Sequence, residues 1–457
     1  MSAAQPNAAL AKARMAAENG GSDFKLGMIF MNDGSAPGQT ATAQVLPVRI
    51  DPATRYVSID AKDPAFFQDP YPVFEAIRAV APVFFWEEPG VWCFLDAEDV
   101  NAIYRDRRFG REILHVATRE ELGIPEIPAH LKPFYDVDNL SMLEREPPVH
   151  TRLRTLVNRA FVSRQIERLR PRIAALCNEL IDGFEAKGSA DLIEAYATPI
   201  PITVIAEILG VPVERAPDLL AWSHAMVGMY QLGRTRAMED AAVAATLEFS
   251  AFLRAYVEER RGKPGDDLIS QLIAAEEQGE KLSEDELITT CILLLNAGHE
   301  ATVHAIGNGV RAILQSGADP KALFASDEAT AAAVEECLRF DPPLHMFMRY
   351  ALEDMEYGGL QLKKGQQVGL MLGAANRDPV RYVAADRFDA SREPKPHVSF
   401  GLGIHFCIGA PLARLEMQVA LPILFERLPG LRFAGQPSYR DAYHFHGLDG
   451  LQLAWDR

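Results

Sequence analysis

The segment from residue 148 to 340 constrains the fold most, because nearly all of it has the apolar spacing of amphipathic helices. Its last long stretch, from Glu284 to about Gln315, follows Ser283 and opens with acidic residues, which is typical of a capped helix start. Short strand-like segments stand on either side, at residues 83–86, 91–95, 349–372, 431–435 and 451–455. The pattern predicts a mainly α-helical protein with a small β-sheet region.

The chain shows no strong linker after residue 45. Residues 1–45 are rich in Ala, Gly and Ser and have few large apolar side chains, so we expect a poorly ordered N-terminal extension. Residues 46–457 are expected to form one large domain. A Pro-rich, weakly periodic stretch at residues 110–140 is predicted to be a long loop of the kind that covers or binds ligands.

The charge and cysteine content exclude several classes of protein. The net charge of -17 argues against binding to nucleic acid or to an anionic membrane surface. No apolar run approaches the ~20 residues that a membrane span needs, and no signal-peptide pattern is visible. The five cysteines are scattered without C-x-x-C spacing, which disfavours a disulfide framework or a structural zinc site. A cytoplasmic protein is expected.

One cysteine stands out in the stretch "FGLGIHFCIGAPLARLE", which runs from Phe400 to Glu416. Cys407 lies in a glycine-rich turn before a predicted helix. It could be a nucleophile with His405 as its base, half of a disulfide, a metal ligand or a small buried side chain. The turn suits a thiolate ligand well, since backbone N–H groups and a helix N-terminus stabilise negative charge on sulfur. The glycines also let the backbone approach a flat ligand.

The same turn resembles the haem-binding loop of the cytochrome P-450 family, whose members are haem-thiolate monooxygenases. Phe400, Gly403, Cys407 and Gly409 have the spacing F-x-x-G-x-x-x-C-x-G, and His405 stands two residues before the cysteine. The resemblance implies a single cytochrome P-450-type domain that holds haem b. By this resemblance Cys407 is the axial thiolate ligand of the haem iron, Phe400 packs beside it and His405 binds a haem propionate.

Further stretches resemble the propionate-binding residues of the family. "HTRLR" places His150 and Arg154 four residues apart on one helix face, and Arg349 follows "DPPLHMFM". Cationic and hydrogen-bond-donating side chains are what the buried carboxylates of a haem require. Taken alone, the helical pair would more often be a surface pair.

An acid and two arginines resemble the structural ion network of the family. "EECLR" contains Glu336 and Arg339 on one helix face, and "ADRFDASR" supplies Arg387 as the second arginine. We assign this network to folding and haem retention rather than to chemistry.

The long helix contains "NAGHEATVH", which resembles the family's A-G-x-acid-Thr motif with one departure. Ala297 and Gly298 correspond to the small residues that open space beside the haem, and Glu300 corresponds to the acid. Ala301 stands where the family has its threonine, and Thr302 comes one step later. One residue is about 100° of helix rotation, so Thr302 cannot replace that threonine without a local distortion. A substrate hydroxyl or an ordered water, supplied by Glu300, is our hypothesis for the proton source.

The resemblance also predicts an apolar substrate pocket. Besides residues 110–140, its expected lining residues are Ala297, Gly298, Ala301, Leu344, Phe347 and Phe445, with Met346 and Met348 adding to its apolar character. His299 and His304 are expected to face outward or to pack. Plain core packing is the alternative for each aromatic residue.

The family resemblance implies a monooxygenase that uses O2 and NAD(P)H-derived electrons on a small apolar substrate. No flavin- or iron–sulfur-binding sequence is visible, so a separate ferredoxin and ferredoxin reductase are expected, and we expect a monomer. The basic side chains of "YRDRRFGRE", which could dock an acidic ferredoxin or form a solvated face, are Arg105, Arg107, Arg108 and Arg111. Two alternatives stay open: a non-hydroxylating haem-thiolate enzyme (oxidative coupling, dehydration or peroxide-driven) and a haem-binding sensor without turnover.

Overall fold

The computed structural model describes residues 46–231, 233–277 and 282–456, so the extension predicted for residues 1–45 lies outside the described part. The α-helices are α2 (Pro64–Phe67), α3 (Tyr71–Arg78), α4 (Ala97–Arg105), α5 (Arg119–Leu122), α6 (Lys132–Asp138), α7 (Val149–Asn158), α8 (Ser163–Glu167), α9 (Arg170–Asp182), α10 (Pro199–Leu209), α11 (Ala216–Val227), α12 (Arg236–Gly262), α13 (Leu268–Glu277), α14 (Glu284–Ser316), α15 (Pro320–Leu323), α16 (Asp327–Phe340), α17 (Leu372–Asn376) and α18 (Ala410–Arg427). Short 3-10 turns are η1 (Ala129–Leu131), η2 (Arg159–Phe161), η3 (Glu185–Lys187), η5 (Val213–Arg215), η6 (Gly228–Tyr230) and η7 (Gly403–His405), and η4 (Ile193–Ala197) is a π-helical turn.

The strands form one large sheet and three small ones. The strands are β1 (Val48–Asp51), β2 (Tyr56–Ile59), β3 (Val83–Trp86), β4 (Val91–Phe94), β5 (Phe109–Gly110), β6 (Ser189–Asp191), β7 (Met346–Ala351), β8 (Met355–Tyr357), β9 (Leu360–Leu362), β10 (Gln367–Met371), β11 (Arg432–Phe433), β12 (Ser438–Tyr439), β13 (Leu448–Gly450) and β14 (Gln452–Ala454). The seven-stranded sheet has the order β1-β2-β3-β4-β10-β7-β5. The smaller sheets are β11-β14-β6, β12-β13 and β8-β9. In the large sheet, β10 pairs with β7 antiparallel and with β4 parallel.

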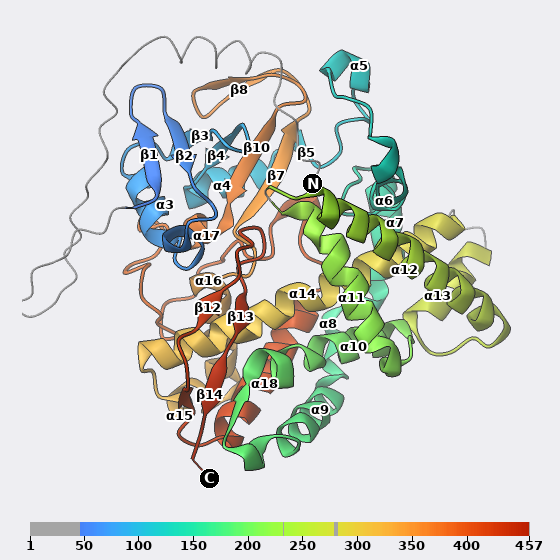
Figure 1. Ribbon diagram of the computed structural model, residues 1–457, viewed down its shortest axis with the longest axis vertical. Helices are drawn as coiled ribbons and strands as arrows, with labels where there is room; N and C mark the ends of the chain where they lie inside the picture. Colours follow the sequence, from blue (N-terminus) through green and yellow to red (C-terminus); the bar gives the residue numbers. More distant parts are fainter. Residues whose placement is uncertain (1–45, 232, 278–281, 457) are drawn as a thin grey trace, which may run out of the picture.

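The long helix α14 crosses the middle of the molecule, with the large sheet on one side and α9 to α13 on the other (Figure 1). Its ends follow from local sequence. The Ser283 side chain accepts a hydrogen bond from the Glu286 N–H while the Glu286 side chain accepts one from the Ser283 N–H, and Gly317 ends the helix with φ 69°. Most of its residues are buried. The predicted helix from Glu284 to about Gln315 is therefore confirmed.

The stretch at residues 110–140 differs from the long loop expected from sequence. It holds α5, with a capping box between Thr118 and Glu121, the turn η1 and α6. The helices are short, so their apolar spacing was too brief to detect. The two C-terminal strands expected from sequence are confirmed as β11 and β14, which pair with each other.

The apolar core consists of a helical part and a sheet part. The largest cluster of buried side chains joins the helices around α14, and two smaller clusters lie on the large sheet. No helix within the described residues combines the length and apolarity needed to cross a membrane.

Candidate active site

The cysteine turn is held open by glycine and by backbone hydrogen bonds. Gly403 has φ 71°, and a Cβ built on it would lie 2.3 Å from the carbonyl oxygen of Tyr104, so only glycine fits there. The Cys407 N–H donates to the Phe400 carbonyl at 2.9 Å, which closes the turn before α18 begins. Cys407 is exposed, whereas the other four cysteines are buried. Its thiol is therefore presented outward and does not serve as core packing.

Backbone N–H groups and two arginines surround the thiol with positive potential. Partial desolvation of the sulfur by the protein atoms around the turn raises the pKa of Cys407, and the N–H groups of Gly409 and Ala410, with Arg154 and Arg414, act to lower it. These groups would stabilise a thiolate ligand. Phe400 packs under the guanidinium of Arg414, whose carbon lies 4.6 Å from the ring centroid.

A group of basic side chains lies beside the turn. Arg154 on α7 donates to the Phe406 carbonyl at 2.6 Å, and the His150 and His405 rings lie 4.4 Å apart. Burial, together with the nearby His405 and Arg154, lowers the pKa of His150 to about 4. The structure therefore brings together three of the four side chains predicted to hold the haem propionates.

The fourth predicted side chain, Arg349, lies on β7 and is 5 % exposed. Its guanidinium carbon lies 4.8 Å from the Tyr104 ring centroid, and one of its N–H groups donates to the Met348 carbonyl. Burial lowers the pKa of Arg349 to about 10. It forms no ion pair with an acid of the described residues. A buried guanidinium without an acid suits an anionic ligand.

This donor set fits haem. An outward-facing thiol, a glycine turn that admits a flat ligand and a rim of buried cations match the ring, the iron and the two carboxylates of the group. Sequence reasoning missed Glu146, whose Oε1 lies 3.1 Å from His405 Nε2 and accepts a hydrogen bond from the Arg111 N–H at 2.7 Å. Its place just before "PPVH" in the sequence was the available signal.

The middle of α14 has one accessible side within an otherwise buried helix. Leu293, Ala297 and Ala301 are four residues apart and are exposed or half-buried, so they share one face. Gly298 was expected to line the pocket beside Ala297, but it lies against α10 instead. A Cβ on Gly298 would lie 2.8 Å from the Ile205 side chain of α10, so its smallness serves helix packing and not space for substrate.

The regular geometry of α14 determines where the Thr302 side chain lies. Residues 284–316 form one unbroken α-helix, so no distortion turns Thr302 toward the accessible face. Thr302 is buried, and Ala301 occupies the accessible side. Without such a distortion, Thr302 does not take the place of the family's threonine on the accessible face.

Glu300 lies in a cluster of basic side chains that the sequence did not predict. Its Oε2 is 3.1 Å from His224 Nε2 of α11 and 3.5 Å from His299 Nε2. Its Oε1 is 3.5 Å from His304 Nε2 and 3.7 Å from an Arg440 nitrogen. Burial acts to raise the pKa of Glu300, but its contacts with the imidazoles, that with His224 first, hold it well below its usual range. His299 and His304, expected to face outward or pack, are buried partners of this acid.

One of the predicted pocket residues lies close to α14, since the Phe445 ring lies 6.4 Å from the His304 ring. Leu344 and Phe445 form an isolated β-bridge, and both are half-buried, as is Phe347. Met346 and Met348 are instead buried in the core of the large sheet, because alternate residues of β7 face opposite sides.

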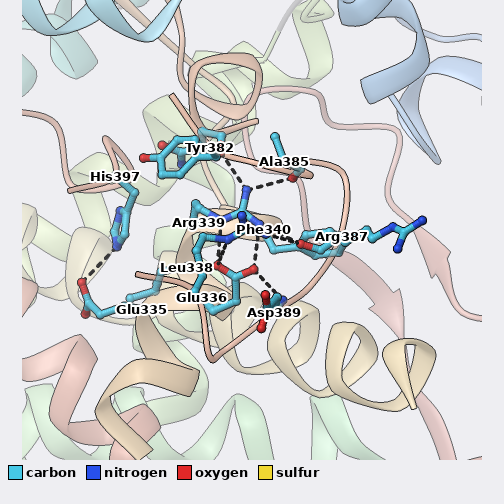
Figure 2. A network of polar contacts seen from close by, with 12 residues as sticks. Glu335, Glu336, Leu338, Arg339, Phe340, Tyr382, Ala385, Arg387, Asp389 and His397 are labelled. Carbon is cyan, nitrogen blue, oxygen red and sulfur yellow. Dashed lines mark hydrogen bonds and ion pairs between the residues drawn. The ribbon is translucent and has the colours of Figure 1, made fainter. Parts of the chain in front are cut away.

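The ion network differs from the prediction in one arginine. Two Arg339 nitrogens, Nε and Nη2, each lie 2.7 Å from a Glu336 oxygen, and its other donors reach the carbonyls of Asn376, Ala385 and Arg387. Figure 2 shows the Arg387 carbonyl facing Arg339 while its side chain points away. The second arginine beside Glu336 is Arg392, whose Nε lies 3.6 Å from Glu336 Oε2. Arg387 therefore contributes its backbone carbonyl to the network, and its side chain is exposed.

The basic stretch proposed for docking is smaller than expected. Arg111 is 4 % exposed and pairs with Glu144, and Arg108 pairs with Asp106. Arg105, Arg107 and Arg108 are exposed, and Arg105 and Arg107 form no ion pair among the described residues.

Comparison with known proteins agrees with this geometry. Residues 328–429 match the family model "Cytochrome P450". The chain is 36 % identical over 401 residues to the polyketide biosynthesis cytochrome P450 PksS of Bacillus subtilis (strain 168), covering 85 % of this chain and 96 % of that protein. It is 35 % identical over 395 residues to the biotin biosynthesis cytochrome P450 of the same organism, covering 86 % and 97 %.

Solved structures give the same result. The crystal structure of P450BioI in complex with an acyl carrier protein that carries hexadec-9Z-enoic acid superposes with a TM-score of 0.80 at 35 % identity, covering 86 % of this chain and all of that chain. The structure of PksS from Bacillus subtilis 168 superposes with a TM-score of 0.78 at 34 % identity, covering 87 % and 100 %. The mainly α-helical, single-domain fold expected from sequence is confirmed. The chain belongs to the cytochrome P450 family and is a haem-thiolate monooxygenase.

Proposed function

We propose that this enzyme inserts one oxygen atom of O2 into a small apolar organic substrate, with electrons from NAD(P)H delivered through a separate ferredoxin and ferredoxin reductase. The observation that carries the substrate class is the apolar character of the accessible face. Ala297 and Ala301 of α14, with Leu344, Phe347 and Phe445, are accessible among buried neighbours and carry no charge. Such a surface favours apolar compounds but discriminates weakly among them, since each methylene is worth about 1–3 kcal/mol.

The haem, when bound, supplies oxygen activation and substrate oxidation. We propose that Cys407 would supply the thiolate ligand of its iron and that His150, Arg154, Arg349 and His405 would hold its carboxylates. The Gly409 and Ala410 N–H groups would keep the sulfur in its thiolate form.

A spectrum tests this assignment without relying on turnover. The reduced protein with carbon monoxide should show the red-shifted Soret band of thiolate-ligated haem, and Cys407→Ser should remove that band while leaving haem bound. Cys337→Ser, a change at a buried cysteine outside the turn, is the matched control. A red-shifted band that persists in Cys407→Ser would overturn the ligand assignment.

The substrate class needs its own experiment. A screen of small apolar compounds should produce shifts in the Soret band of the ferric enzyme, and compounds that shift it should be converted to oxygenated products. Ala297→Phe should weaken binding by filling the accessible face, whereas Leu247→Phe, at an exposed position on α12, should not. Equal binding by both variants would contradict the proposed pocket.

We further propose that protons reach the site through Glu300. His224 is exposed by nearly half and lies 3.1 Å from this buried carboxylate, so it can pass protons from solvent to Glu300. Ala301 has no hydroxyl to continue the path, and a substrate hydroxyl or an ordered water completes it. Product formed per NAD(P)H consumed should be high in wild type with the true substrate. A poorly coupled wild type whose coupling Ala301→Thr restores would contradict this route.

The alanine at position 301 also favours one second candidate, a peroxide-driven or other non-hydroxylating reaction. A path that lacks the family's hydroxyl suits an oxidant that already carries its protons. Turnover with hydrogen peroxide alone should then exceed turnover with redox partners.

The redox-partner proposal is supported by the exposed Arg105 and Arg107 in an acidic chain. Reversing both charges to Glu should slow electron transfer and reduce its dependence on salt. Reversing Arg164, exposed on α8, is the control. Unchanged salt dependence in the double variant would place the docking surface elsewhere.

A further inference from the structure

The Glu300 cluster contains a second, unassigned arrangement of ligand atoms. His224, His299 and Glu300 each offer one atom, and the three atoms lie within 4.8 Å of one another. We propose that these three residues bind a divalent transition-metal ion, with Zn²⁺ as the ion that best suits them, at a site separate from the haem.

The distances match zinc coordination. Ligand atoms about 2.1 Å from a tetrahedral zinc ion lie about 3.4 Å from one another. Glu300 Oε2 is 3.1 Å from His224 Nε2 and 3.5 Å from His299 Nε2. Two imidazoles and one carboxylate form a recurrent three-residue zinc set that leaves a fourth position for water.

The orientation of His299 supplies an independent argument. Its Nδ1 lies 2.7 Å from the Leu295 carbonyl oxygen, which can only accept, so Nδ1 carries the hydrogen. In the neutral ring Nε2 then presents a lone pair. Nε2 is fully buried and has no hydrogen-bond partner among the described residues, and the group it faces is a carboxylate oxygen. A lone pair opposite an anion is unfavourable, and a cation between the two atoms makes the arrangement favourable; a backbone carbonyl on the second ring nitrogen is the usual support of a metal-bound imidazole.

The other two charged groups near Glu300 approach the carboxylate oxygen that faces away from His224 and His299. His304 and Arg440 approach Oε1, the other oxygen of Glu300, at 3.5 and 3.7 Å. They compensate part of the acid's charge at Oε1, whereas His224 and His299 both face Oε2. Because the His224 side chain is 47 % exposed, an ion can enter from solvent.

A second group with similar composition lacks these properties. Asp341 Oδ1 accepts a hydrogen bond from Tyr71 at 2.8 Å, its Oδ2 accepts one from Tyr439, and Arg311 lies 3.6 Å away. Its carboxylate is saturated by donors, and its histidines, His345 and His446, are buried. It is an internal polar network, and we infer no metal there.

The site has a consequence for turnover that rests on the proposed function. Zinc held by His224 and Glu300 would occupy both groups of the proposed proton path. Binding of the ion should therefore slow product formation, and chelation should reverse the effect.

The test uses tag-free, haem-loaded enzyme titrated with zinc chloride against a chromophoric chelator, with zinc content measured after dialysis. One zinc per chain is expected, and Mg²⁺ should not compete because the set contains two imidazoles. His224→Ala and Glu300→Gln should weaken zinc binding at least about tenfold. His115→Ala, at an exposed histidine outside the cluster, should bind zinc like wild type.

The outcomes separate the two proposals. Absence of stoichiometric zinc in wild type, or unchanged affinity in His224→Ala with an intact reduced carbon monoxide spectrum, would overturn the metal site. Zinc bound through these residues that leaves turnover unaffected would support the metal site and contradict the role of Glu300 in proton supply.

Discussion

Replacing Arg392 should destabilise the fold, whereas replacing Arg387 should not. Arg392 donates to the carbonyls of Val383, Ala384 and Arg387 and lies 3.6 Å from Glu336, and its side chain is 13 % exposed. These three hydrogen bonds are exposed to solvent, so each contributes near the lower end of the roughly 0.5–1.5 kcal/mol of an ordinary hydrogen bond, and an ion pair near solvent contributes about 0–1 kcal/mol. Since Arg339 still neutralises Glu336, we expect Arg392→Met to cost about 2 kcal/mol, or an approximately 30-fold shift toward unfolding.

Arg387→Met is the matched variant, because the exposed Arg387 side chain contributes no contact to the network and its carbonyl is kept. Its cost should stay within about 0.5 kcal/mol. Urea unfolding of the haem-loaded enzymes, followed by far-ultraviolet circular dichroism, measures both values from midpoints at unchanged slope. If Arg387→Met costs as much as Arg392→Met, the assignment of Arg392 as the second arginine is wrong.

Three further predictions follow from packing and charge. Gly298→Ala should cost about 1–3 kcal/mol in thermal unfolding through its clash with Ile205, and the double variant with Ile205→Ala should cost less than the sum; additive costs would contradict the contact. Arg349→Leu should speed haem transfer to apomyoglobin about tenfold or more, and an unchanged rate would argue against its role at the propionates. Burial, with Arg111 nearby, lowers the pKa of His444 to about 3, so between pH 6.5 and 3 the unfolded chain binds a proton that the folded chain does not. Stability should fall by about 2 kcal/mol between pH 7.5 and 5 through this residue, and His444→Phe should remove that loss in urea unfolding; equal pH dependence would refute it.

The fold was predictable where the signal was local. Ser283 and the acids after it mark the start of α14, and the motif around Cys407 marks the turn before α18, since both depend on residues close in sequence. The short helices at residues 110–140 lacked enough turns for a periodic pattern.

The partners of Glu300 were not predictable, because their proximity is tertiary. His224 comes 76 residues before it and Arg440 comes 140 residues after it, and neither lies in a motif. Arg387 and Arg392 belong to one loop, and only the backbone direction decides which side chain turns inward. A glycine at position 298 could either open space for substrate or allow two helices to pack closely. Only the position of Ile205 shows that it allows close packing.

The pairing of β4 with β10 has a consequence for biosynthesis. Trp92 pairs with Val368, 276 residues later, and the two strands are parallel neighbours in the middle of the large sheet. At about 5–20 residues per second, a ribosome needs roughly 14 to 55 s to make the intervening chain. During that time one edge of β4 has no partner strand, and the apolar side chains of Phe84 and Trp86 lack part of their cover. Early synthesis therefore leaves an aggregation-prone hairpin that a chaperone can protect until the second half of the chain emerges.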